Sequence, residues 1–172
     1  MDAHLPVLFL HAFPLNAAMW RGQVAALGGR RSLAPDHPGF GGRPPDLPDL
    51  DRFAAAAAAE MDAAGMARAV LVGLSMGGYV ALRFHALWPH RVAAMVLADT
   101  RAGADDEAGR AKRTDQAGRM RREGVGWLPD AMLPALLGET TRGAKPEVVE
   151  AVRAMMEGAD PEAVSRRALE RG

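Results

Sequence analysis

Apolar residues occur along the first hundred positions in short continuous runs, and helix-like segments lie between them. The four segments predicted as strands cover residues 5–10, 31–36, 68–75 and 91–99, and the second of them, "RSLAPD", is apolar only in its middle. Turn residues bound them, and apolar residues do not alternate with polar ones. This pattern is typical of strands that are buried on both faces, as in a parallel sheet.

Three helical segments separate the predicted strands, at residues 17–29, 50–65 and 76–88. The first two end in glycine, the second is rich in alanine, and the third stops before Pro89. Strands that alternate with helices predict an α/β fold with right-handed crossovers. Ligands of such sheets bind at the carboxyl ends of the strands.

The pattern changes after Thr100, where no further strand-like run occurs. We expect an α/β core over residues 1–100 and a helical segment over residues 101–172. The helices predicted in the second part cover residues 107–124, 128–138, 145–158 and 160–172.

Composition narrows the classes of partner and chemistry. The 172 residues carry 21 basic and 21 acidic side chains, which argues against nucleic acid or an anionic membrane as the main partner. The absence of cysteine excludes disulfides and thiol catalysis. No run is long enough to span a membrane, and no signal peptide or metal-binding motif is recognisable, so we expect a cytoplasmic protein without metal.

One short motif carries chemistry. Gly73-Leu74-Ser75-Met76-Gly77 lies where a predicted strand meets a predicted helix, and it matches the G-x-S-x-G pattern. The pattern places a serine hydroxyl on a sharp turn, at the N-terminus of a helix whose N–H groups favour negative charge. Ser75 is therefore the candidate nucleophile, and the alternative is an ordinary strand-to-helix turn.

A serine nucleophile that attacks a carbonyl needs two N–H donors for the oxyanion. One donor comes from the residue after the nucleophile, here Met76, and the other from a loop after a neighbouring strand. The segment "HAFPLN" follows the first strand and places Phe13 for this role, whereas we expect His11 to support the loop.

The segments "FLHAFPLNAAMW", "PDHPGFGG" and "LVGLSMGGYVALRF" occur in an order that resembles the α/β-hydrolase superfamily. The chain is most similar to the group of 3-oxoadipate enol-lactonases and small esterases, although Ala12 replaces the usual glycine. The resemblance implies hydrolysis of a small ester or lactone through an acyl-serine, with no cofactor. It also implies that residues 101–172 form a cap over the active site. A cofactor-free haloperoxidase or a C–C bond hydrolase would share these motifs.

The general base is the part of this machinery that the sequence does not supply. In the family an acid and then a histidine follow the nucleophile, but no histidine follows His90. His37 is the only positional candidate for the base and Asp99 for the acid, and both also suit structural roles. The remaining histidines are His4, His11 and His85.

These observations predict a chain that lacks the C-terminal third of the family's fold. The alternative to an active hydrolase is an impaired remnant or a non-catalytic interaction module. In that case we expect self-association through the open edge of the strand at 91–99.

Apolar positions in the helical segment predict a lining for the active site. We expect a few of them to form an apolar pocket above Ser75 that favours small hydrophobic or cyclic acyl groups. These positions are Met132, Leu133, Leu136, Leu137, Met155 and Met156.

Overall fold

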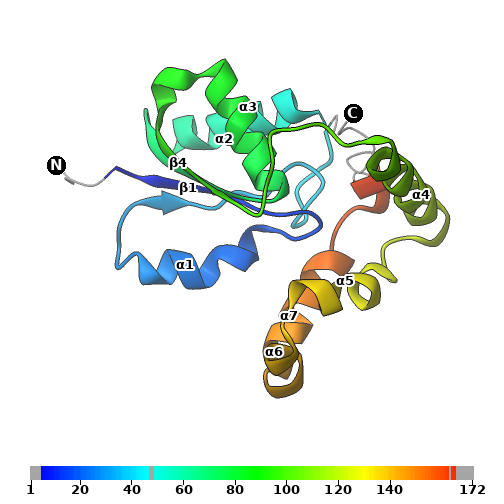
Figure 1. Cartoon of the computed structure of the whole chain (residues 1–172). Helices are drawn as coiled ribbons and strands as arrows, with labels where there is room; N and C mark the ends of the chain where they lie inside the picture. Colours follow the sequence, from blue (N-terminus) through cyan, green and yellow to red (C-terminus); the bar gives the residue numbers. More distant parts are fainter. Residues whose placement is uncertain (1–4, 47–48, 163, 166–172) are drawn as a thin grey trace.

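The computed structural model describes residues 5–46, 49–162 and 164–165. Four parallel strands in this part form one sheet in the order β2-β1-β3-β4 (Figure 1). The strands are β1 (Val7–Leu10), β2 (Ser32–Leu33), β3 (Ala69–Leu74) and β4 (Val92–Ala98). The predicted α/β class and the four strands are confirmed. The run at 31–36 yields only the two residues of β2, since these alone pair with β1.

Helices cover both faces of this sheet. Helices α2 and α3 pack together on one face, and α1 lies on the other (Figure 1). The segment predicted as a helix at 17–29 begins as a 3-10 turn, η1, before it continues as α1. The elements are η1 (Ala17–Trp20), α1 (Arg21–Ala26), α2 (Leu50–Ala63), α3 (Met76–Leu87) and η2 (Pro89–Arg91).

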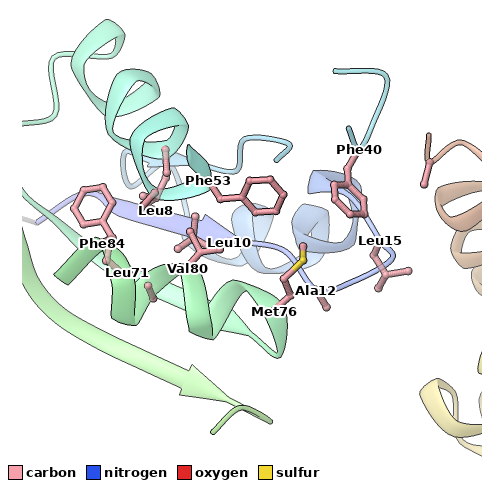
Figure 2. Close-up of a cluster of buried hydrophobic side chains, with 14 of the residues drawn as sticks. Leu8, Leu10, Ala12, Leu15, Phe40, Phe53, Leu71, Met76, Val80 and Phe84 are labelled. Carbon is pink, nitrogen blue, oxygen red and sulfur yellow. The ribbon is translucent and has the colours of Figure 1, made fainter. Parts of the chain in front are cut away.

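Strand β1 shows why its sequence is apolar at every position. Leu8 and Leu10 are fully buried in the large cluster between the sheet and helices α2 and α3 (Figure 2). On the opposite face Phe9 packs on Trp20, with 5.0 Å between the ring centroids. Burial of each such side chain contributes about 1.5 to 3 kcal/mol, so both layers of helices hold the central strand.

The chain after β4 forms helices that gather beyond the carboxyl ends of the strands (Figure 1). Met120, Leu128 and Met156 from these helices are buried in the same cluster as the sheet residues. The predicted helices at 107–124, 128–138 and 145–158 are confirmed, whereas α6 was not predicted, and 160–172 lies largely outside the described residues. The helices are α4 (Glu107–Glu123), α5 (Leu128–Leu136), α6 (Glu139–Ala144) and α7 (Pro146–Glu157). Within the described ranges, no helix is long and apolar enough to cross a bilayer.

Candidate active site

Ser75 occupies the turn between β3 and α3. Its backbone dihedrals are φ 51° and ψ −110°, and its side chain makes no capping hydrogen bond to the helix. A positive φ is unfavourable for a residue with a side chain, and it is kept only where the surroundings enforce it. The next residue, Met76, begins a helix of 12 residues. The hydroxyl is thus attached at the positive end of a helix dipole.

Close packing explains the two glycines that flank Ser75. A Cβ atom on Gly73 would lie 2.4 Å from the carbonyl oxygen of Gly77. A Cβ atom on Gly77 would lie 2.0 Å from the carbonyl oxygen of Leu10. Both obstacles are backbone atoms, which cannot rotate away. These two close approaches explain why the motif has a glycine two residues before and two residues after Ser75.

The end of β4 holds the turn in place. The Ser75 N–H donates to the Ala98 carbonyl at 2.9 Å. The Thr100 hydroxyl donates to the Ser75 carbonyl at 2.9 Å. Asp99, which lies between Ala98 and Thr100, has a φ of 43° and an exposed side chain. The last residue of β4 thus holds the Ser75 N–H, and Thr100, just beyond the strand, holds the Ser75 carbonyl.

A cavity of about 310 Å³ brings the candidate residues together. Phe13, Ser75 and Met76 line it, together with Tyr79 on the next turn of α3. Its other side consists of residues from the segment after β4. These are Arg101, Asp105, Gly109, Lys112, Arg113, Gln116 and Met132. The loop after β1, the turn before α3 and the helical segment therefore meet at one site, at the carboxyl ends of the strands.

The described histidines do not contribute to the lining of this cavity. His37 is 2% exposed, and its ring stacks on Phe53 with 5.1 Å between the centroids. His85 is exposed near the C-terminus of α3, and His90 is exposed in η2, which follows that helix. None of the described histidines lines the cavity, and Asp99 does not line it either. His4 lies outside the described residues, and neither His37, the positional candidate for the base, nor Asp99, the candidate for the acid, lines the cavity with Ser75.

His11 supports the loop, as its sequence context suggests. Its Nδ1 lies 3.0 Å from the Ala12 carbonyl, and its Nε2 lies 2.9 Å from the His37 backbone nitrogen. The Nδ1 therefore carries the proton and donates to the carbonyl, while Nε2 accepts from the backbone N–H. Burial lowers the pKa of His11 to about 4, against weaker raising effects from the Ala12 carbonyl and Asp36. The imidazole is consequently neutral at neutral pH.

This shift predicts a pH dependence of stability. Since the folded pKa lies below the ordinary value of 6.5, the unfolded chain binds the proton more tightly. The free energy of unfolding should therefore fall by about 1 kcal/mol per pH unit as the pH drops from 6.5 to 4. Urea unfolding across this range measures the slope. His11→Gln should flatten it, and an unchanged slope in that variant would assign the effect to another group.

The carboxylate of Asp105 is the buried charge at the cavity. Its side chain is 1% exposed and forms ion pairs with Arg101 and Arg113. Burial by itself would raise the pKa of Asp105, but the hydrogen bonds from Arg113 and Arg101 outweigh this and hold the pKa below its ordinary value. Asp105 thus stays ionised and holds two guanidinium groups beside the cavity.

The expected apolar pocket is wrong in its main feature. A few of six apolar positions were expected to line it, but of the six only Met132 does, while Leu133, Met155 and Met156 are buried, Leu137 is half-buried and Leu136 is exposed. The helical segment contributes mostly charged and polar side chains instead. The positions of these residues on α4, 109, 112, 113 and 116, recur at helical spacing. The spacing puts these four residues on one face of α4, but the sequence does not distinguish this face from the others.

Within the described ranges, no group of three or more histidine, cysteine or acidic side chains is placed to hold a metal ion.

Solved structures resemble this chain over nearly its whole length. A thermophilic esterase from Thermogutta terrifontis, described with malate bound, is 39% identical with a TM-score of 0.90, over 98% of this chain and 64% of that one. The enol-lactonase from Burkholderia xenovorans LB400 is 25% identical with a TM-score of 0.86, over 99% and 65%. This chain thus spans slightly less than two thirds of each of these proteins.

Curated relatives match over about half of this chain. Epoxide hydrolase A of Mycobacterium tuberculosis is 39% identical over 95 residues, which are 52% of this chain and 30% of that protein. The non-heme chloroperoxidase of Streptomyces lividans is 39% identical over 98 residues, which are 54% of this chain and 36% of that protein. A model of the alpha/beta hydrolase family matches residues 7–170. The chain belongs to the alpha/beta hydrolase family.

Proposed function

We propose that this chain carries the nucleophilic half of a serine hydrolase that acts on small esters or lactones. The observation that carries the proposal is the geometry of Ser75. A strained serine follows a central strand, directly precedes a helix and lines a cavity that Phe13 and Met76 also line. The names of the two similar solved structures, an esterase and an enol-lactonase, support the same class of reaction.

The proposed step is acyl transfer to the serine. The Ser75 Oγ attacks the carbonyl carbon of the substrate, and the backbone N–H groups of Phe13 and Met76 stabilise the oxyanion. The C–O bond to the leaving alcohol breaks, and the alcohol leaves with a proton. Water then hydrolyses the acyl-serine to release the acid.

The proton of the Ser75 hydroxyl must leave during attack. Because none of the described histidines lines the cavity, water takes this proton in our proposal, and turnover is slow. Loss of triad members in a serine protease still leaves about 10³ to 10⁴ of catalysis over water. We therefore expect a weak but measurable reaction that depends on the turn geometry.

The test is to trap the acyl-serine. After incubation of the folded chain with p-nitrophenyl acetate, mass spectrometry of peptides should find an acetyl group on Ser75, because deacylation without a base is slow. Ser75→Ala should carry no acetyl group on the corresponding peptide. Acetylation spread over surface lysines, with none on Ser75, would contradict the proposal.

A second candidate function, that of an interaction module, is favoured by the outer edge of β4. In the described part of the chain no strand pairs with this edge. Val96 and Leu97 are 51% and 42% exposed and point to opposite faces of the sheet. An unpaired apolar edge is a template for pairing with another chain. We propose that two copies of this chain associate through β4.

Light scattering of the purified 172-residue chain tests this association. The apparent mass should rise with protein concentration, and Leu97→Lys should reduce the rise because a charge on the edge opposes pairing. Val24→Lys, at an exposed apolar position on α1, is the matched control and should leave the rise unchanged. A monodisperse chain at every concentration would exclude the module.

A further inference from the structure

The wall of the cavity opposite Ser75 carries an excess of positive charge. Among the described residues, the lining has three cationic side chains and one carboxylate. The cations, which we call the basic wall, are Arg101, Lys112 and Arg113. After Asp105 is counted, a formal excess of two positive charges remains beside the serine. An excess of one sign in a concave site raises the local concentration of ligands of the opposite sign.

Asp105 holds the arginines of the basic wall in place and neutralises only part of the positive charge of that wall. The carboxylate is almost fully buried and forms ion pairs with both arginines. The closest contact uses one nitrogen of each guanidinium group, whereas a guanidinium carries five N–H donors. Two held arginines lose less conformational entropy on binding a ligand than two free ones would.

A capping residue fixes the N-terminus of α4, and one face of this helix then carries part of the basic wall. Asp106 caps the helix, and its carboxylate accepts from the Gly109 N–H at 2.8 Å. Gly109, Lys112, Arg113 and Gln116 then line the cavity from successive turns of the same helix. Lys112 therefore lies on a helical position beside the paired arginines, not on a loop.

The remaining lining and the size of the cavity limit the ligand. Phe13, Met76, Tyr79 and Met132 supply apolar surface between the serine and the basic wall. The volume, about 310 Å³, is at the lower end of the range of about 300 to 1,000 Å³ for ligand pockets. A compact ligand with an apolar middle and an anionic end fits this combination.

We propose that the basic wall binds a carboxylate at the far end of the acyl chain, so that the substrate is a half-ester of a short dicarboxylic acid. The ester carbonyl lies at Ser75, and the free carboxylate accepts hydrogen bonds from Lys112 and from guanidinium N–H groups. This assignment rests on the proposed role of Ser75, which it deepens by naming the substrate class.

Equilibrium binding tests the assignment without requiring turnover. Isothermal titration calorimetry on the Ser75→Ala chain compares succinate with succinamide, which is neutral and similar in shape. Succinate should bind at least about tenfold more tightly, the factor that corresponds to 1.4 kcal/mol. Raising the salt concentration should weaken the binding of succinate, because exposed charges are screened.

Lys112→Met should reduce succinate affinity about tenfold, while the melting temperature stays unchanged because this lysine is exposed. The chain has one other lysine, Lys145, so Lys145→Met is the matched control and should bind like the parent. Two results would overturn the carboxylate site even if Ser75 is acylated: equal affinity for succinate and succinamide, or no effect of Lys112→Met.

The proposed function of the serine is tested separately. It would be overturned if succinate binding depends on Lys112 but no acetyl group is found on Ser75. Tighter binding of inorganic phosphate than of succinate would also overturn the assignment to carboxylates.

Discussion

Replacing Gly77 with alanine is expected to destabilise the fold by about 3 kcal/mol or more. The new methyl group would lie 2.0 Å from the Leu10 carbonyl oxygen and 3.0 Å from that of His11. Both oxygens belong to the chain at the end of β1, so relief requires movement of a central strand. Urea unfolding of the variant measures the loss.

Gly22→Ala is the matched control for this substitution. Gly22 lies in α1, and a Cβ atom there would meet no atom within 4 Å. Alanine favours a helix over glycine by about 1 kcal/mol, so this variant should be as stable as the parent or slightly more stable. If Gly77→Ala unfolded at the same urea concentration as Gly22→Ala, the close approach of α3 to β1 would be disproved.

Removing the Ser75 hydroxyl is expected to abolish acyl transfer while leaving the fold intact. Ser75→Ala keeps a side chain at a φ of 51°, so its stability should match that of the parent. Ser75→Gly removes the side chain from this unfavourable region. We expect it to raise the free energy of unfolding by about 1 kcal/mol, after the entropy cost of glycine is included.

Comparison of Ser75→Ala with Ser75→Gly separates the backbone strain at this position from the chemical role of the hydroxyl. Both should lose the acetyl-serine adduct completely, and only Ser75→Gly should gain stability. Urea unfolding and peptide mass spectrometry on the same samples check both results. A Ser75→Gly chain that is less stable than Ser75→Ala would mean that the turn is not strained in the way its dihedrals indicate.

Much of the fold could be predicted because short segments of the sequence already indicate their own secondary structure. The runs that became β1 and β3 are apolar at nearly every position, and the glycines around Ser75 mark the end of a strand. The length of β2 was overestimated because the length of a strand depends on the strand it pairs with, and only two residues of β2 pair with β1. Helix α6 was missed because six residues give too little periodicity to separate it from its neighbours.

The only part of the site that could be predicted is the turn around Ser75, because its backbone conformation requires particular residues at fixed positions. Gly73, Ser75 and Gly77 are recognisable from spacing, since the turn requires small residues at fixed positions. The basic wall was not predicted, because the side of α4 that faces the cavity depends on how the helix docks on the core. Lys112 and Arg113 look like ordinary surface residues until Asp105 and the cavity are placed beside them.

The central claim is that the fold makes Ser75 a nucleophile, and labelling by a fluorophosphonate probe tests it most directly. The chain has three serines, Ser32, Ser75 and Ser165, so the labelled peptide identifies the site. We predict slow labelling of Ser75 alone in the folded chain, loss of labelling in Ser75→Ala, and a much lower rate in urea, where the oxyanion donors are no longer held. Equal rates for the folded and unfolded chains, or labelling of Ser32 in place of Ser75, would contradict the account.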